Sequence, residues 1–231
     1  MVYQEYEKRW IFRVLIFVAG FYGGYAMLVR GGAFSNAQTG NVALMAIELG
    51  KGNWQKALYF LIPISAYLLG TMTAELMPRK LRGHGKLHWS TLLPLLEMVM
   101  VILMGFIPAT APHQICQVII SFTCAMQYHT FPSAEGDAMA TTFCTNLIRQ
   151  IGAGLAKTLD DRQNRKKYLK KAGVFAAMVL FFALGVFAAT ISIHWLGTYA
   201  IWLNLLPLTV IFVDLLRADL HDSAEMKETS C

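Results

Sequence analysis

Charged residues are scarce in this sequence. Asp, Glu, Lys and Arg make up 15% of the 231 residues, while hydrophobic residues make up 56%. Soluble globular domains carry about 25% charged residues, so the composition excludes an ordinary soluble domain. The charges gather in short runs, and the apolar stretches between them are roughly 18 to 22 residues long, enough to cross a hydrocarbon core about 30 Å thick. We therefore predict an all-α integral membrane protein with a single membrane domain, 1–231.

The sequence also lacks the motifs that mark common enzyme classes. There is no G-x-S-x-G, H-E-x-x-H or G-x-G-x-x-G sequence and no phosphate-binding loop. Membrane enzymes that act at depth usually cluster acids or histidines there, and this chain has no such cluster. We therefore expect that the protein is not an enzyme and that it uses no cofactor and no metal.

Cysteine is rare, and none of the four cysteines is spaced as C-x-x-C. Three of them lie in or beside apolar segments, which predicts small buried hydrophobic residues and not metal ligands or redox centres. His84 and His88 are four residues apart, as two ligands on one helix face would be. They belong to a basic, glycine-rich loop, however, and are interpreted as solvated. The cysteines are Cys116, Cys124, Cys144 and Cys231.

Acids are fewer than bases, and the formal net charge is +6 at pH 7. In a membrane protein such an excess marks the loops held at the cytoplasmic face. No soluble module presents a basic surface, so a nucleic-acid partner is not expected. The basic residues concentrate in the loops 79–90 and 157–171, which we predict to be cytoplasmic together with the N-terminus and the tail 217–231. The first apolar run lacks a small-residue cleavage site and is interpreted as a retained helix.

Six segments are predicted to span the membrane. Aromatic residues mark several of their ends, as expected for side chains that rest at the level of the lipid headgroups. The predicted spans are Trp10–Val29, Ala57–Met77, Thr91–Ile107, His113–Tyr128, Ala172–Ile191 and Thr198–Leu216.

Two further stretches, 31–50 and 138–157, are mostly apolar, but polar and small residues crowd their first halves. About nine to twelve residues of good helix then remain in each, which is too short to span but suits a half-helix that enters the membrane and returns. If both stretches crossed, the basic loop 79–90 would lie outside. If neither crosses, both basic loops and both termini lie inside, and the positive-inside rule favours this topology.

This topology divides the chain into two units, 10–107 and 113–216. Each unit has three spans and one broken stretch, and an odd number of spans makes the two units inverted relative to each other. Aligning Asn41 with Asn146 also brings Gly70 near Gly185. Inverted repeats with broken elements that meet at the midplane are typical of transporters and channels. The hypothesis requires the two broken stretches to lie on opposite sides of the bilayer.

The polar stretches resemble a known family. Ala37-Gln38-Thr39-Gly40-Asn41, after a glycine-rich first helix, is similar to the threonine-glycine-asparagine signature of the YoaK-like family of bacterial inner-membrane proteins. The sequences Met126–Phe131 and Ala140–Leu147 are similar to the family's methionine-glutamine stretch and its twin-threonine, asparagine-leucine segment. The match covers nearly the whole chain, although Thr145 stands where many relatives place glycine. The resemblance implies a six-helix protein of a family regarded as transporters without an established substrate.

Asn41 and Asn146 are the first candidates for a binding site. At the start of a half-helix an asparagine either caps the free backbone N–H groups or offers its amide to a ligand, and both interpretations remain open. A helix N-terminus carries roughly half a positive charge, which favours an anion or a polar oxygen. The predicted substrate-binding residues are Gln38, Thr39, Asn41, Gln127, Thr142, Asn146 and Arg149.

Two charged residues inside apolar segments need an explanation. Arg149 lies three residues after Asn146, so it requires a carboxylate, an anionic ligand or a route by which its long side chain reaches the interface. Glu97 lies deeper in its predicted span than Glu75 does, and it is the stronger candidate for an ion or proton partner.

The leading functional hypothesis is a transporter or channel for a small polar or anionic solute, with its centre at the two broken stretches. The alternative is a non-transporting scaffold or sensor that binds a protein or lipid through the loops 79–90 and 157–171. An enzyme acting on a lipid headgroup is a weaker third. Gly20 and Gly24 form a G-x-x-x-G pattern, which allows close helix contact within a monomer or in a homo-oligomer.

Overall fold

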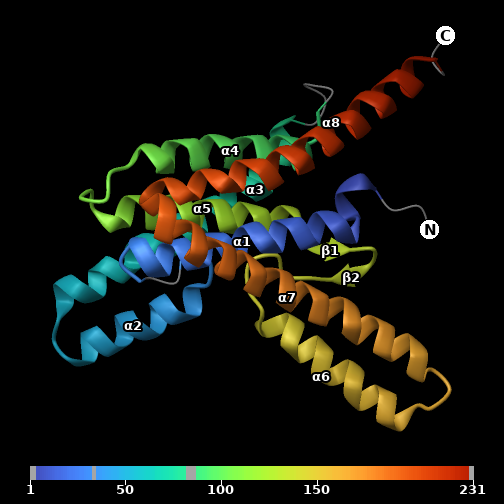
Figure 1. Ribbon diagram of the computed structural model, residues 1–231, viewed down its shortest axis with the longest axis horizontal. Coiled ribbons are helices and arrows are strands. Elements are labelled where there is room, and N and C mark those ends of the chain that lie inside the picture. Colours follow the sequence, from blue (N-terminus) through green and yellow to red (C-terminus); the bar gives the residue numbers. More distant parts are fainter. Residues whose placement is uncertain (1–3, 33–34, 82–86, 229–231) are drawn as a thin grey trace.

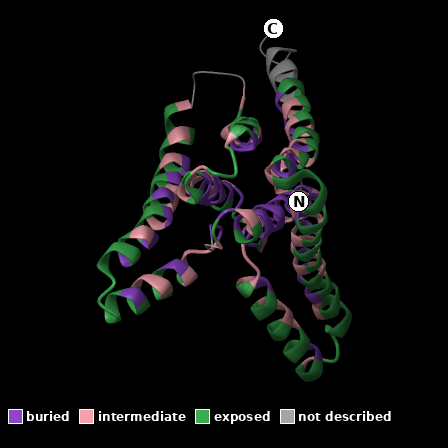
Figure 2. Ribbon diagram, turned by 60° about the vertical axis from the view of Figure 1, so that its left-hand side comes forward, coloured by how far each residue is buried: buried purple, intermediate pink, exposed green. Residues whose placement is uncertain are grey.

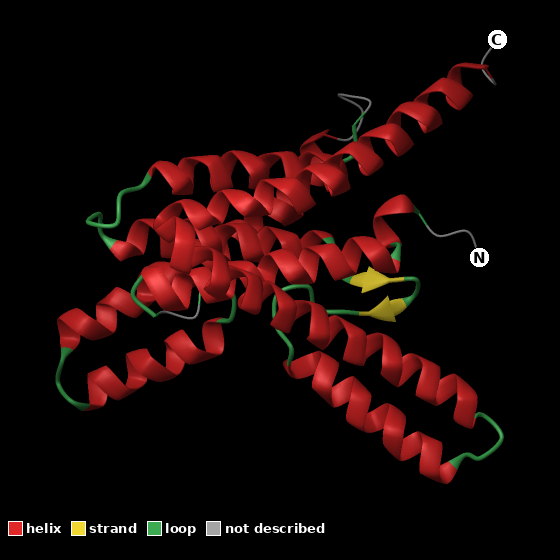
Figure 3. Cartoon of the chain, in the orientation of Figure 1, coloured by secondary structure: helices red, strands yellow, loops and turns green. Residues whose placement is uncertain are grey.

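The chain is helical almost throughout, as Figures 1 and 3 show. The computed structural model describes residues 4–32, 35–81 and 87–228. His84, Cys231 and part of the basic loop 79–90, including Arg82 and Lys86, lie outside these ranges. The helices are η1 (Glu5–Glu7), α1 (Arg9–Val29), α2 (Gln38–Gly50), α3 (Trp54–Leu81), α4 (Trp89–Phe106), α5 (His113–Thr130), α6 (Thr145–Asp160), α7 (Arg165–Leu196), η2 (Gly197–Asn204) and α8 (Leu205–Glu228).

Four helical stretches in the described part of the chain are long and apolar enough to cross a membrane. They are Arg9–Val29, Trp54–Leu81, Trp89–Phe106 and Arg165–His221, the last of which runs through α7, η2 and α8. The helix predicted at His113–Tyr128 forms as α5, but its glutamines and histidines keep it out of this set. The prediction of an all-helical architecture is confirmed in its main features, and the apolar helices fit a membrane protein.

Several predicted boundaries need correction. The segment predicted as the sixth span does not begin as an α-helix at Thr198, because Gly197 has φ +55° and η2 precedes α8. The tail 217–231 is helical as far as Glu228. The all-α prediction also missed a small hairpin of β1 (Ser133–Ala134) and β2 (Asp137–Ala138), which Figure 3 shows in yellow.

The hairpin is held by ion pairs to two helices. Its turn is formed by Glu135 and Gly136, both with positive φ, as tight hairpin turns require. The carboxylates of Glu135 and Asp137 form ion pairs with the guanidinium of Arg9 on α1 at 3.2 and 3.4 Å. Asp137 also pairs with Lys171 of α7 at 2.5 Å. The hairpin therefore ties the start of α1 to the first half of α7.

The helices pack in a regular scheme. α1 lies along α7 and α3 along α5, while α2 packs on α3, α6 on α7, and α4 on α8. Glycines permit the closest contacts: a Cβ at Gly20 would lie 2.2 Å from the carbonyl oxygen of Phe182, and a Cβ at Gly24 would lie 3.1 Å from the Cβ of Ala189. The G-x-x-x-G pattern of α1 therefore faces α7 of the same chain.

The two broken stretches form short helices. α2 has 13 residues and α6 has 16, so at 1.5 Å per residue they are about 20 and 24 Å long, less than the roughly 30 Å of a hydrocarbon core. Both helices are longer than the nine to twelve residues predicted, although still shorter than a full span. In Figure 1 the two helices diverge, so that the α2–α3 loop and the α6–α7 loop lie at opposite ends of the molecule.

The loop between α6 and α7 is organised by one acid within the basic segment. Asp161 accepts hydrogen bonds from the side chain and backbone of Asn164 and from the backbone of Gln163. The Asn164 side chain contributes most to holding the pKa of the Asp161 carboxyl below its ordinary value.

Buried residues are concentrated where the helices converge, whereas the far ends of the α2–α3 and α6–α7 hairpins are mostly exposed (Figure 2). The exposed surface includes many large apolar side chains, such as Leu68, Leu69, Leu180 and Phe187. A lipid-facing surface has this composition. Cys116 and Cys124 are buried among apolar residues, as predicted.

Candidate functional site

The segments that precede α2 and α6 meet inside the bundle. The Asn36 side chain donates from Nδ2 to the carbonyl oxygen of Thr142 at 3.1 Å, and both residues are buried. Gly23 of α1 leaves room for this contact, since a Cβ there would lie 3.1 Å from Nδ2 of Asn36. We call the residues 35–38 and 141–144, with the side chains that contact them, the central junction.

Helix α5 binds both sides of the central junction. Ser121 donates its hydroxyl to the carbonyl oxygen of Ser35 at 2.8 Å, and Gln38 donates to the same oxygen at 3.2 Å. Six residues further along α5, Gln127 donates to the carbonyl oxygens of Leu15 at 3.3 Å and Thr141 at 3.5 Å. The polar residues that lower the hydropathy of α5 thus fix the backbone of the two breaks.

The junction also contains donors without a protein acceptor. The hydroxyls of Ser35 and Thr141 are buried and have no hydrogen-bond partner among the described residues. The N-cap residues of α2 and α6 are Ala37 and Cys144, and neither side chain makes a capping hydrogen bond. Two helix starts and two hydroxyls therefore offer hydrogen bonds to an oxygen-rich ligand.

The predicted site residues divide into two groups. Gln38, Asn41, Gln127 and Thr142 belong to the central junction or contact it, and Asn41 donates from Nδ2 to Oε1 of Gln38 at 2.8 Å. Thr39 is exposed. Asn41 and Asn146 lie within the first turns of their helices, past the N-cap positions, so the capping role is wrong.

Arg149 does not reach the central junction. It is exposed on α6 and donates from Nη2 and Nε to Oδ1 of Asn146 at 2.9 and 3.3 Å. The reason is helical register: residues three apart share a face, and the face that carries Asn146 and Arg149 is not the one that buries Leu147. The positive charge expected at the centre is therefore replaced by neutral donors.

Sequence reasoning passed over Ser35, Asn36 and Ser121 as individual site residues, whereas Thr141 was among the threonines expected to line the centre with hydroxyls. Ser35 and Asn36 precede the recognised signature, so proximity to it was the available signal. The sequence provides no signal for Ser121, because a lone serine in an apolar helix usually bonds to the backbone of its own helix.

Glu97 forms a second polar site within α4. The residue is fully buried, and neither carboxylate oxygen has a hydrogen-bond partner in the described part of the chain. The Tyr22 hydroxyl of α1 and the Cys124 thiol of α5 lie close enough to interact with it electrostatically. Cys124 also lies within electrostatic range of Tyr67, whose hydroxyl is beside Thr142. These side chains lie between Glu97 and the central junction, each within electrostatic range of the next.

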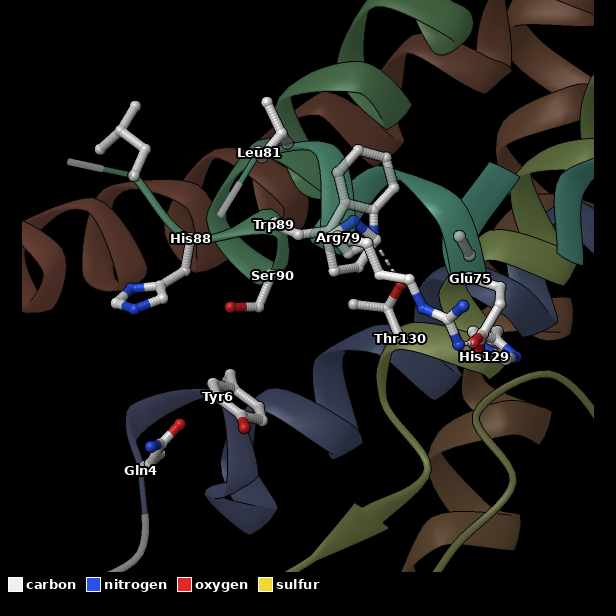
Figure 4. A pocket seen from close by; sticks show the side chains of 13 residues that line it. Gln4, Tyr6, Glu75, Arg79, Leu81, His88, Trp89, Ser90, His129 and Thr130 are labelled. Atoms are coloured by element: carbon white, nitrogen blue, oxygen red, sulfur yellow. Dashed lines mark hydrogen bonds and ion pairs between the residues drawn. The ribbon is translucent and has the colours of Figure 1, made fainter. Parts of the chain in front are cut away.

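A cleft of about 660 Å³ opens where α3 ends and α4 begins, with Tyr6 of η1 on its opposite wall (Figure 4). Glu75 pairs there with Arg79 and, at 2.8 Å, with Nε2 of His129. Trp89 donates from Nε1 to the hydroxyl of Thr130 at 2.8 Å. The cleft contains none of the predicted site residues.

His88 also lines this cleft. Its side chain is largely exposed, as predicted, and its Nδ1 lies 2.8 Å from Oδ1 of Asp219. The contact joins the start of α4 to α8.

These observations define a class of protein. Its chain is helical almost throughout, with several apolar helices long enough to span a membrane and a buried polar junction. Residues 11–213 match the family described as "Protein of unknown function (DUF1275)". The chain belongs to this family, which agrees with the resemblance to YoaK-like proteins. No match was found among curated proteins or among solved structures.

Proposed function

We propose that this protein is a transporter or channel for a small polar or anionic solute in the bacterial inner membrane, with both termini in the cytoplasm. Its six spans would form two inverted repeats, 10–107 and 113–216. The observation that carries the proposal is the meeting of two broken elements inside an apolar bundle, through the bond from Asn36 to Thr142. Irregular backbone at membrane depth is tolerated where it is buried in protein or lines a cavity.

Helix packing supports the repeats. We match α1 with α5, α2 with α6, α3 with α7 and α4 with α8. Under this matching the α1–α7 contact corresponds to the α5–α3 contact, and the α2–α3 contact corresponds to the α6–α7 contact. The α4–α8 contact corresponds to itself. The close glycine contacts obey the same rule. A Cβ at Gly70 would lie 2.3 Å from the carbonyl oxygen of Phe122, and one at Gly185 would lie 2.0 Å from that of Phe17. Phe17 and Phe122 are separated along the chain by the same interval as Asn41 and Asn146.

A repeated tetrapeptide adds to this support. Leu-Leu-Pro-Leu occurs at 92–95 in α4 and again at 205–208 in α8, the helix that corresponds to α4. The preceding residues, Thr91 and Asn204, are fully buried, and their side-chain polar atoms have no partner among the described residues. In both proposed units, therefore, a buried polar residue directly precedes the same apolar tetrapeptide near the start of the third span.

The chemistry of the junction favours a solute that accepts hydrogen bonds. The hydroxyls of Ser35 and Thr141 and the first turns of α2 and α6 provide donors and partial positive charge. Broken helices of transporters bind anionic groups at such N-termini. Carboxylates, small anions and polar oxygens of neutral solutes share this acceptor chemistry.

We predict that Thr141→Val separates ligand binding from stability. Valine keeps the shape of threonine and removes a buried hydroxyl that has no partner in the described part of the chain, so the variant should fold at least as well as the parent. A thermal-shift screen of purified protein against metabolites and inorganic anions is expected to find a stabilising compound. At 100 times its dissociation constant, that compound should stabilise the parent by about 2.7 kcal/mol.

Thr145→Val is the matched control, because Thr145 is an exposed threonine at the start of α6, four residues after Thr141. The control should keep both the thermal shift and solute flux in proteoliposomes, whereas Thr141→Val should lose both. Equal flux in the two variants would show that the central junction is not the solute site. A screen without any stabilising compound would favour the scaffold interpretation, and a search for partners of the basic loops would follow.

A further inference from the structure

We propose that Glu97 carries a proton in the resting protein and that this proton moves with the solute, so that the protein is a proton-coupled transporter. The inference rests on the proposed function, which it extends from a solute site to a coupling ion. It is carried by the position of Glu97 and its neighbours.

The burial of Glu97 favours a neutral side chain. The residue is 0% exposed, and neither oxygen receives a hydrogen bond from the described residues. An ionised carboxylate in such surroundings has lost its hydration without any compensating partner, and a group so placed takes up a proton to become neutral. Ionisable residues that persist inside membrane spans commonly belong to ion pathways and proton relays.

The groups that face Glu97 do not supply a counter-charge. Tyr22 of α1 and Cys124 of α5 interact with it electrostatically, and both are neutral as protonated groups. Elsewhere on α4, Trp202 of η2 donates to the carbonyl oxygen of Ile102, and Thr209 of α8 donates to Sδ of Met98. Neither of these side chains titrates. No cation lies beside Glu97 among the described residues, so a proton or a metal cation is left to neutralise its charge.

The neighbours fit a proton better than a metal cation. Sodium, magnesium and calcium are hard cations that require several oxygen ligands, including carbonyls or water. Around Glu97 the backbone is continuous α-helix, and the identified neighbours are one phenol and one thiol. Among the described residues, no group of three His, Cys, Asp or Glu side chains is arranged to hold a metal.

The place of Glu97 also fits coupling. Cys124 lies within electrostatic range of both Glu97 and Tyr67, and the Tyr67 hydroxyl is beside Thr142 of the central junction. A change in the backbone of the break, caused by solute binding, would therefore alter the surroundings of the carboxyl. The proton would bind Glu97 from one side of the membrane and leave to the other, and an anionic solute moving with it would carry the compensating charge.

The decisive experiment is infrared difference spectroscopy of the purified protein at neutral pH, which needs no knowledge of the solute. We expect the carbonyl stretch of a protonated carboxylic acid, sensitive to H/D exchange, in the parent protein. Glu97→Gln should abolish this band. Asp214→Asn, which removes an α8 carboxyl that interacts with Glu5 and has one buried oxygen without a partner among the described residues, and Glu75→Gln at the exposed cleft should retain it. If Glu97→Gln does not fold, ¹³C-labelled glutamate should shift the band in both the parent and Glu75→Gln, and Glu97 is the fully buried glutamate among the described residues.

The outcomes separate this inference from the proposed function. Absence of a protonated-carboxyl band in the parent protein, or its survival in Glu97→Gln, would overturn the proton on Glu97 even if Thr141→Val behaves as predicted. A rise in thermal stability with sodium chloride over potassium chloride that is lost in Glu97→Gln would assign the site to sodium. A protonated-carboxyl band that is lost in Glu97→Gln would support the proton on Glu97. Loss in Glu97→Gln of solute uptake driven by acidification would support the coupling of that proton to solute movement.

Discussion

Gly185→Ala is expected to destabilise the bundle severely, whereas Gly173→Ala on the same helix should be tolerated. A Cβ at Gly185 would lie 2.0 Å from the carbonyl oxygen of Phe17 and 2.9 Å from the backbone nitrogen of Phe21. Both atoms belong to the backbone of α1, so the helices must move apart, and we expect a loss of about 3 kcal/mol, at the upper end for overpacking. Thermal unfolding of the purified variants in detergent would measure the difference.

Gly173 is a matched control because no atom lies within 4 Å of the Cβ that alanine would add there. Alanine is preferred over glycine in a helix by about 1 kcal/mol, so this variant should be neutral or slightly more stable. Gly70→Ala tests the corresponding α3–α5 contact and should behave like Gly185→Ala. If all three variants melt alike, the close contacts described for α1–α7 and α3–α5 do not exist in the folded protein.

The apolar pattern predicts most of the helices correctly because it reports where a chain prefers lipid or protein to water. It cannot report where a helix ends within polar sequence. α3 and α7 therefore extend beyond the predicted Ala57–Met77 and Ala172–Ile191, into the basic segments that follow or precede them. The hairpin at 133–138 was missed because its stability comes from ion pairs with Arg9 and Lys171, which are distant in sequence.

The candidate site was predicted at the level of the segment but not of the residue. Polar residues crowded into apolar stretches indicate a break, and the two breaks do meet. Which side chains face the meeting point depends on helical register and on the neighbouring helix, and neither can be read from composition. Arg149 looked important because it is charged, yet it lies on the exposed face of α6, whereas the neutral Asn36 makes the bond between the breaks.

Arg30 is the clearest case of a residue whose role only the fold reveals. In the sequence it stands at the end of an apolar run beside two glycines, where a basic residue ordinarily rests at the interface. In the structure it is fully buried. It donates to the carbonyl oxygens of Ile107 at 2.8 Å and Pro108 at 3.1 Å, just past the end of α4, and to the Tyr25 hydroxyl at 3.0 and 3.1 Å.

Arg30→Met should therefore cost about 3 kcal/mol, because hydrogen bonds to a charged group contribute about 1.5 to 3 kcal/mol and the variant loses those to two carbonyls and a hydroxyl. The variant removes the donor from the half-buried carbonyl of Ile107 and from that of Pro108, at the negative end of the α4 dipole. It also releases the Tyr25 hydroxyl, which donates to the carbonyl oxygen of Thr198 at 3.0 Å and so connects α1 with η2. Thermal unfolding in detergent, compared with Arg149→Met, would measure the effect.

The Arg149 control removes an exposed arginine that bonds only within its own helix, so a change within about 0.5 kcal/mol is expected. Arg30→Lys should recover only part of the loss, because one ammonium cannot reproduce the planar fork that reaches two carbonyls and a hydroxyl together. Equal stability of Arg30→Met and Arg149→Met would mean that Arg30 reaches water at the membrane surface. The ends of α1 and α4 would then be joined by apolar packing alone.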